Sequence, residues 1–211
     1  MKLGILLSGS GRTLLNLNQH IKKGSVRAEI RVVISSSRKC LGVERAKKLG
    51  IPVVIMRKRK SLTEEEYSHA ITQSLEEHHV DLVVLAGFLK KYLPSKHYEN
   101  SCINIHPSLI PAFCGPGFYG SKVHQAVWRR GCTVSGCTVH FVNEQYDAGP
   151  IILQKTVCLH AEDSPELIAQ KVFEKECEAL PEAIQLIIEK KVHIIDGRVH
   201  RKTEEEPTGA C

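Results

Sequence analysis

An asparagine and a histidine two residues apart carry the clearest chemistry in this sequence. Asn104 and His106 belong to the apolar run Ile103–His106, which is typical of a strand and which Pro107 ends. Because alternate residues of a strand share a face, both side chains should point the same way at its carboxyl end. An amide N–H and an imidazolium can stabilise the charge that acyl transfer places on oxygen, and histidine moves protons near neutral pH. The pair therefore predicts acyl-transfer chemistry, against the plainer alternative of a histidine packed in the core.

A carboxylate beside this histidine would raise its pKa and select its tautomer. Asp147 is the candidate, in the loop Asn143–Pro150 between two expected strands. Gly149 and Pro150 follow it and could turn the chain back toward the strand end. No spacing argument brings Asp147 to His106, so their meeting is an expectation that the fold must test.

A glycine-rich turn, Ser8–Thr13, stands where a first strand meets a first helix. Glycine lets the backbone approach an anion closely, and a helix start offers free N–H groups. Gly11, Arg12 and Thr13 are therefore predicted to bind a phosphate, the alternative being a plain strand-to-helix turn. A dinucleotide fingerprint would need a third glycine where Leu14 stands. Arg38 could serve a phosphorylated ribose, so a nucleotide-binding module without acyl-transfer chemistry stays open.

Apolar strands alternate with amphipathic helices along most of the chain. This order predicts an α/β fold, a single doubly wound and mostly parallel sheet with helices on both faces. One domain over residues 1–202 is expected, with antiparallel edge elements near the C-terminus and a disordered tail at 203–211. The expected strands are 2–7, 29–35, 52–56, 81–86, 103–106, 133–142 and 151–157, and the expected helices are 14–23, 43–49, 62–79 and 165–190. A capping box is expected at Ser61–Glu64, and a hairpin around Asp196-Gly197.

Composition bounds the partners. The chain has 211 residues, 29 Lys+Arg against 23 Asp+Glu, and a net charge of +6, which suits anionic small molecules or simple solubility. With 5% aromatic residues, a base-stacking surface for nucleic acid is not expected. No apolar run is long enough for a membrane span. Eight scattered cysteines without paired His/Cys spacing predict no metal site and a cytoplasmic protein. The sequence allows a monomer or a homodimer.

Together these segments resemble the phosphoribosylglycinamide formyltransferases, folate-dependent enzymes of de novo purine (IMP) biosynthesis. The resemblance runs from Met1 to about Lys191. It rests on Ser8–Gly11, Val83–Phe88, Ile103–Leu109, Thr138–Val142 and Asp147–Gln154.

The resemblance implies direct transfer of a formyl group from 10-formyltetrahydrofolate to glycinamide ribonucleotide, a small phosphorylated amine, without a metal. Asn104 would bind the formyl oxygen, His106 would act as general acid, and Asp147 would raise its pKa. Gly11, Arg12 and Thr13 would hold the ribose phosphate, and Glu176 the glycinamide end. The folate pocket would be lined by Leu89, Lys90, Lys91, Tyr92 and Asn104. Formyltetrahydrofolate hydrolase, with water as acceptor, is the enzymatic alternative; such relatives usually carry an added regulatory domain.

Some positions depart from the family pattern. Thr13 stands where an asparagine is expected, and Glu64 where some relatives carry an arginine that contacts the cofactor. The glycine-rich segment Phe113–Gly120 is longer than usual and is interpreted as a lid, or alternatively as an irregular loop; Cys114 within it is not expected to be a nucleophile. The basic run Arg57–Lys60 is interpreted as a solvated loop, with attraction of a folate glutamate tail as the alternative.

Overall fold

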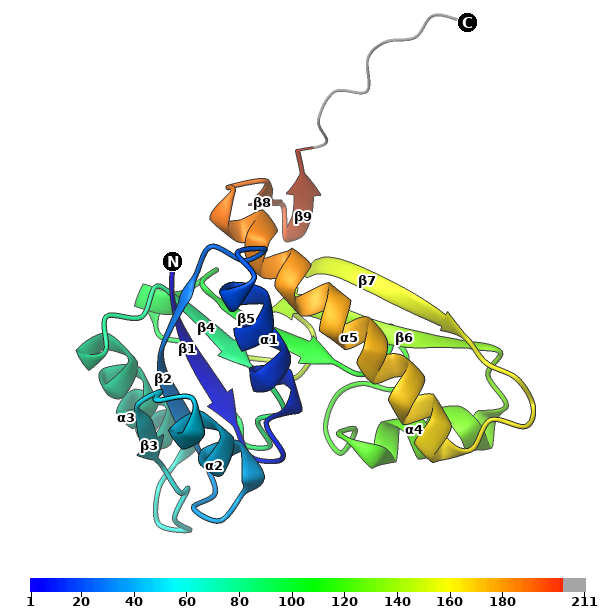
Figure 1. Ribbon diagram of the computed structural model, residues 1–211, viewed down its shortest axis with the longest axis horizontal. Coiled ribbons are helices and arrows are strands. Elements are labelled where there is room, and N and C mark those ends of the chain that lie inside the picture. The colour runs from blue at the N-terminus through cyan, green and yellow to red at the C-terminus, as the bar shows by residue number, and fades with distance from the viewer. Residues whose placement is uncertain (203–211) are drawn as a thin grey trace, which may run out of the picture.

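The computed structural model describes residues 1–202; the tail predicted at 203–211 lies outside the described residues. Seven strands form one sheet in the order β3-β2-β1-β4-β5-β6-β7 (Figure 1). Their bounds are β1 Lys2–Leu7, β2 Glu29–Ser35, β3 Val53–Ile55, β4 Leu82–Leu85, β5 Cys102–His106, β6 Val134–Phe141 and β7 Ile151–Cys158. The strands from β1 to β5 are parallel, and β6 and β7 are antiparallel to their neighbours, as the sequence predicted.

Helices cover both faces of the sheet. They are α1 Arg12–Lys22, α2 Leu41–Lys48, α3 Glu64–Glu77, α4 Ser121–Arg130 and α5 Pro165–Ile188, with a 3₁₀ turn, η1, at Lys96–Tyr98. Leu3, Ile5 and Leu7 face one core, which the first two and last two helices close, while Leu6 faces a second core under α3. In Figure 1, α1 and α5 lie side by side over one face. The alternation of side chains in β1 thus accounts for the doubly wound fold.

The start of α3 corrects one expectation. The capping box uses Thr63, whose hydroxyl accepts from the Glu66 amide while the Glu66 carboxylate accepts from the Thr63 amide. The predicted box began two residues earlier, at Ser61. Since Thr63 satisfies the first free amides, the helix begins at Glu64 rather than at Leu62.

A small hairpin, β8 Val192–Ile195 and β9 Arg198–Arg201, follows α5. The two turn residues, Asp196 and Gly197, have φ of 51° and 72°, the left-handed pair that the Asp-Gly signal predicted. The Arg201 guanidinium donates to the Ile152 carbonyl, which fastens the hairpin beside β7. No helix within residues 1–202 is long and apolar enough to cross a membrane.

Candidate active site

A cavity of about 540 Å³ opens beyond the carboxyl ends of β1, β4 and β5. It is lined by the glycine turn, the loop after β4, the end of β5, and the loops that precede α4 and β7. Ligands of parallel α/β sheets bind at this edge, because adjacent loops separate there. The cavity contains Asn104, His106 and Asp147 together with Gly11, Arg12, Thr13, Glu176 and the four predicted folate residues. The structure therefore gathers every sequence-predicted site residue around one space.

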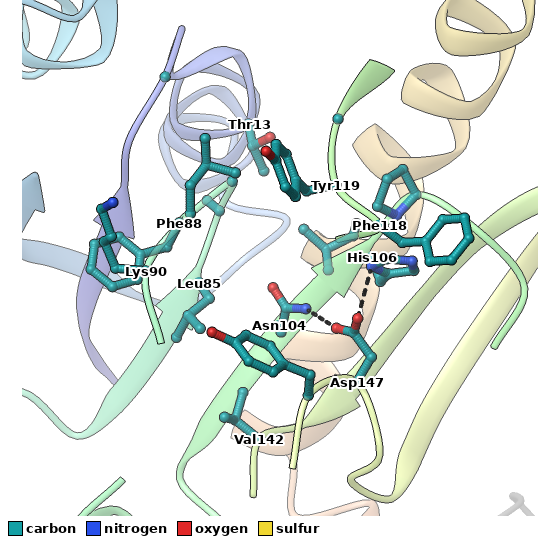
Figure 2. A pocket seen from close by; sticks show the side chains of 18 of the residues that line it. Thr13, Leu85, Phe88, Lys90, Asn104, His106, Phe118, Tyr119, Val142 and Asp147 are labelled. Atoms are coloured by element: carbon teal, nitrogen blue, oxygen red, sulfur yellow. Dashed lines mark hydrogen bonds and ion pairs between the residues drawn. The ribbon is translucent and has the colours of Figure 1, made fainter. Parts of the chain in front are cut away.

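Asp147 reaches the two strand residues, as Figure 2 shows. Its Oδ1 accepts from the Asn104 amide at 3.4 Å, and its Oδ2 lies 3.6 Å from His106 Nδ1. The second distance is too long for a direct hydrogen bond and becomes an ion pair only when His106 is protonated. Asn104 and His106 face the cavity together, as strand alternation predicted.

The loop before β7 is held by a close backbone contact at Gly149. A Cβ built at Gly149 would lie 1.8 Å from the Phe141 carbonyl oxygen, so only glycine fits there. The Phe141 amide donates to the Pro150 carbonyl at 2.9 Å, which ties the end of the loop to β6. Asp147 itself has φ of 53°, a left-handed conformation that aspartate tolerates better than most residues. This anchoring explains how a residue 41 positions after His106 in the chain returns to it.

His140, to which the sequence assigned no role, is the fourth member of the cluster. In the antiparallel register it lies directly opposite Asn104, and a bulge in β7 follows at this position. Its Nδ1 donates to the Phe141 carbonyl at 2.8 Å, so its Nε2 is the acceptor for the Asn104 amide at 3.1 Å. Its Nε2 is also 3.7 Å from Asp147 Oδ1. The sequence shows a histidine within the apolar run of β6. Its place in the site depends on which residue of β5 it pairs with, and the sequence does not give that register.

Burial sets the charge of the cluster in the ligand-free site. Removal from water lowers the pKa of His106 below its ordinary value, although the charge of Asp147 and the Phe113 carbonyl act in the opposite direction. The predicted upward effect of Asp147 is present, but burial outweighs it. For Asp147 burial raises the pKa, yet its contacts with His140, His106 and the Gly115 amide together lower it. A carboxylate thus faces a neutral His106 at pH 7.

The loop Phe113–Gly120 closes against these same residues. The Phe113 carbonyl accepts from His106 Nε2 at 2.9 Å, which places the proton of the neutral imidazole on Nε2. The Gly115 amide donates to Asp147 Oδ2 at 2.8 Å. Any ligand atom that uses His106 Nε2 must replace the Phe113 carbonyl. The loop predicted to be a lid therefore occupies the hydrogen-bonding positions that a substrate would need.

A further histidine, His124 of α4, lines the same cavity. Burial first, and the neighbouring charge of His106 second, lower its pKa to about 4. Within residues 1–202 its buried Nδ1 has no hydrogen-bond partner. His124 is therefore a neutral ring at pH 7, and its Nδ1 is an unpartnered buried polar atom.

The glycine turn presents backbone rather than side chains. Gly11 stands before the first residue of α1 with φ of 71°, and no side chain caps the helix. A Cβ built on Gly11 would lie 2.6 Å from Gly42 Cα, so the turn packs against the start of α2. The guanidinium of Arg12 lies 3.6 Å from the centroid of the Phe173 ring on α5. Free helix amides beside a positive side chain suit a phosphate.

The four predicted folate residues other than Asn104 occupy different places. Leu89 is exposed at the mouth of the cavity, and its amide donates to Ser8 Oγ at 2.8 Å. Lys90 lines the same opening. Lys91 pairs with Glu64 at 3.2 Å, so the glutamate at this position binds a lysine of the pocket wall. Tyr92 belongs largely to the core under α3, where its hydroxyl lies 3.0 Å from Thr72 Oγ1.

Glu176 reaches the cavity from α5, opposite the glycine turn. Burial raises the pKa of its carboxyl to about 8, and the charge of Arg12 acts in the opposite direction. With this pKa the carboxyl is largely protonated at pH 7, and in that form it can both donate and accept hydrogen bonds. Within residues 1–202, no three His, Cys, Asp or Glu side chains are grouped to hold a metal ion.

The chain belongs to the formyl transferase family, whose model matches residues 1–184. It is 37% identical to the chloroplastic phosphoribosylglycinamide formyltransferase of Vigna unguiculata over 90% of this chain, and spans 62% of that protein. It is 34% identical to the phosphoribosylglycinamide formyltransferase of Haemophilus influenzae, over 93% of this chain and 91% of that protein.

Solved structures agree with this assignment. Glycinamide ribonucleotide transformylase 1 from Symbiobacterium toebii superposes with a TM-score of 0.88 at 33% identity, covering 95% of this chain and 93% of that one. A formyltetrahydrofolate deformylase from Pseudomonas syringae superposes with a TM-score of 0.84 at 25% identity, covering 95% of this chain and 65% of that one. The same fold thus occurs in a protein named for glycinamide ribonucleotide and in one named for deformylation.

Proposed function

We propose that this enzyme transfers the formyl group of 10-formyltetrahydrofolate to the amine of glycinamide ribonucleotide in purine biosynthesis. The observation that carries the proposal is one cavity with an amide, an imidazole and a carboxylate at one end and a phosphate-type turn at the other. The names of the relatives support the acceptor. A cytoplasmic location is proposed from the sequence alone.

His106 starts the reaction as a neutral imidazole in this proposal. The folate cosubstrate supplies a formyl carbon bonded to nitrogen. As the acceptor amine forms its bond to that carbon, the Asn104 amide and the His106 ring stabilise the electron pair that moves onto oxygen. Once a substrate displaces the Phe113 carbonyl, the ring proton moves to Nδ1 beside Asp147. The free Nε2 then takes the proton that the amine loses and passes it to the folate nitrogen as the old carbon–nitrogen bond breaks. Asp147 stabilises the imidazolium between these two transfers, at its contact distance of 3.6 Å.

The two ends of the cavity would hold the two substrates. The helix amides at Gly11–Thr13 and the Arg12 guanidinium bind the ribose phosphate. Glu176, protonated at neutral pH, exchanges hydrogen bonds with the glycinamide end. The folate would lie against the loop of Leu89, Lys90, Lys91 and Tyr92. This loop forms the wall and mouth of the cavity on the side away from the glycine turn.

Hydrolysis of the same donor is the second candidate, and the structural similarity to a deformylase favours it. The two reactions differ only in the acceptor, which is an amine in one and water in the other. Folate released per minute with and without glycinamide ribonucleotide separates them. Release that needs the amine supports transfer, whereas equal release without it supports hydrolysis.

Replacement of His106 by alanine tests the mechanism. We expect kcat to fall about 10³-fold, since both proton transfer and oxyanion stabilisation are lost. KM for the phosphorylated amine should stay within about threefold, because the phosphate site does not involve His106. A kcat close to that of the wild type would exclude the proposed role of His106.

A further inference from the structure

The loop Phe113–Gly120, called the lid from here on, carries an exposed aromatic side chain at the phosphate end of the cavity. Tyr119 is 45% exposed and lines the same cavity as Gly11, Arg12 and Thr13. In Figure 2 its ring points from the lid toward Thr13 of the glycine turn. Packing in a core does not account for this position, because almost half of the residue is open to solvent. Tyr119 therefore faces, from the lid side, the space that a phosphate on the turn would occupy.

Lys122, in the first turn of α4, holds the Tyr119 hydroxyl. Its Nζ donates to that hydroxyl at 3.0 Å and lies 4.4 Å from the centroid of the ring. An ammonium group only donates, so the hydroxyl accepts here and keeps its own hydrogen for another partner. Within residues 1–202, no acceptor takes that hydrogen. The O–H group of Tyr119 is therefore an unused donor at the cavity wall.

The neighbouring cations suit this donor to an anion. The hydrogen bond from Lys122 and the charges of Lys122 and Lys90 lower the pKa of Tyr119. A hydroxyl that accepts from an ammonium is polarised and donates more strongly. In the part of the chain that the structure describes, residues 1–202, no ion pair joins Arg12, Lys90 or Lys122 to a carboxylate. Their charges are therefore available to an anion such as a phosphate.

Glycines flank the part of the lid that carries Tyr119. Gly117 and Gly120 have φ of 91° and 52°, a region that other residues rarely adopt. A Cβ built at either position would meet nothing within 4 Å, so the backbone conformation, and not close packing, requires glycine. These two joints permit Tyr119 to adjust to a ligand while α4 stays in place.

We propose that Tyr119, positioned by Lys122, binds the phosphate of the acceptor from the lid side and makes the enzyme select phosphorylated amines. The inference rests on the proposed function, because the glycine turn must hold the ribose phosphate. The first amides of α1 contact one side of that phosphate, and the Tyr119 O–H group donates to an oxygen on the other side. Hydrogen bonds to a charged oxygen are the strong ones. A dephosphorylated amine leaves the hydroxyl without this partner.

The first test compares glycinamide ribonucleotide with glycinamide riboside, its dephosphorylated form. The ratio of the two kcat/KM values, measured at saturating folate donor, isolates what the phosphate contributes. Tyr119→Phe removes only the hydroxyl, and a hydrogen bond to a charged group is worth about 10- to 100-fold. Because Tyr119 is half exposed, we expect the ratio to fall about tenfold, at the lower end of that range.

Lys122 acts through Tyr119, so its variants test positioning. Lys122→Met cannot hold the hydroxyl, and the same ratio should fall about threefold, the size typical of an exposed charged contact. Lys122→Arg still donates and should restore most of the ratio. A Lys122→Arg ratio as low as that of Lys122→Met would exclude the positioning role.

Inorganic phosphate provides a measurement that does not depend on turnover. A ligand that binds the folded state raises Tm, so phosphate added at constant ionic strength should stabilise the wild type. The phosphate concentration that gives half of this rise should be about tenfold higher in Tyr119→Phe, as the loss of one such hydrogen bond predicts. A wild-type protein that phosphate does not stabilise would overturn the inference.

Two matched controls are available on the same elements. Tyr146→Phe removes the hydroxyl of another cavity tyrosine, 47% exposed and also near a lysine, and Arg130→Gln removes an exposed charge from the far end of α4. Both should keep the wild-type ratio. An unchanged ratio in Tyr119→Phe, or an equal loss of kcat/KM with both acceptors, would overturn the inference alone. A wild type inactive with the phosphorylated amine would reject the proposed function, while the phosphate titration would still decide whether Tyr119 binds phosphate.

Discussion

The two ends of the cavity are built in opposite ways. At the reaction end, Asn104, His106, Asp147 and His140 contact one another, and the Asn104 amide donates hydrogen bonds to His140 and Asp147. His106 Nε2 is also engaged, by the Phe113 carbonyl. A substrate arriving there must exchange existing hydrogen bonds for new ones. The reaction end therefore depends on the chemical identity of its side chains.

The phosphate end is mainly backbone, with the Arg12 guanidinium beside it. Gly11 turns the chain in a left-handed conformation, and the first amides of α1 have no side-chain cap. These donors are ready for an anion without rearrangement. The phosphate end therefore depends on the path of the chain and on the space that Gly11 and Gly42 leave each other. Substitutions at the two ends should consequently act on different kinetic constants.

Asp147→Asn is expected to cause the largest loss of activity at the reaction end. The variant loses the charge that stabilises the imidazolium, and kcat should fall about 10³-fold with a smaller change in KM. Because the charge of Asp147 raises the pKa of His106, its loss should also move the acid limb of the kcat/KM profile to lower pH.

Asp196→Asn is the matched control for that variant. Asp196 has φ of 51°, close to the 53° of Asp147, but it lies in the remote hairpin turn. Its kinetics should equal those of the wild type. If Asp147→Asn kept more than about a third of the wild-type kcat, charge stabilisation at the reaction end would be refuted.

Gly11→Ala should act on the other end. The new Cβ would meet Gly42 Cα at 2.6 Å, so the turn must shift and its amides lose their alignment. We expect KM for the phosphorylated amine to rise about tenfold, with kcat at saturation within about twofold. Steady-state kinetics at saturating folate measure both constants.

Gly24→Ala is the control that separates the backbone strain of a left-handed alanine from the displacement of the phosphate turn. Gly24 has φ of 77°, and a Cβ there would meet nothing within 4 Å. In both variants an alanine in the left-handed conformation should lower the free energy of unfolding by about 1 kcal/mol, which is measured as a lower Tm. Only Gly11→Ala should raise KM. A similar rise in both would mean that general destabilisation, not the shape of the turn, is responsible.

His140→Phe tests the support of the reaction end. Phenylalanine keeps the bulk of this 2% exposed ring but cannot accept the hydrogen bond from Asn104. Residues that orient a functional group typically contribute about 10- to 100-fold, so we expect kcat to fall about tenfold. Ser135→Ala is the control, a buried position on the same strand whose hydroxyl has no partner within residues 1–202. If kcat were unchanged in His140→Phe, Asn104 would not need His140.

The contrast between the ends also explains what the sequence could predict. Asn104 and His106 were predictable because strand alternation is local, and the glycine turn because it joins neighbouring elements. His140 was missed because its meaning depends on the antiparallel register with β5. The arrival of Asp147 depends on the close contact of Gly149 with Phe141, which no spacing rule contains. The sequence also could not predict that the pKa of His106 is lowered, because the burial that lowers it exists only in the folded chain.

The smallest expected effect concerns Glu176, which lies across the cavity from the glycine turn. Burial raises the pKa of its carboxyl from 4.5 to about 8. Between these values the folded protein binds more protons than the unfolded chain, so this group's contribution to stability is lost as pH rises from 4.5 through 8. In Glu176→Gln, which cannot ionise, Tm should fall less between pH 5 and pH 9 than in the wild type.

The exposed Glu174 on the same helix supplies the control, and Glu174→Gln should follow the wild-type profile. Parallel profiles for wild type and Glu176→Gln would show that Glu176 is ionised at neutral pH. Its carboxylate would then attract the acceptor amine rather than exchange hydrogen bonds with the glycinamide. Because a neutral carboxyl and an amide have similar shape and hydrogen bonding, KM of Glu176→Gln near pH 6 should stay within about threefold of the wild type. A much larger rise at that pH would favour the charged form and would make this end depend on side-chain charge as the reaction end does.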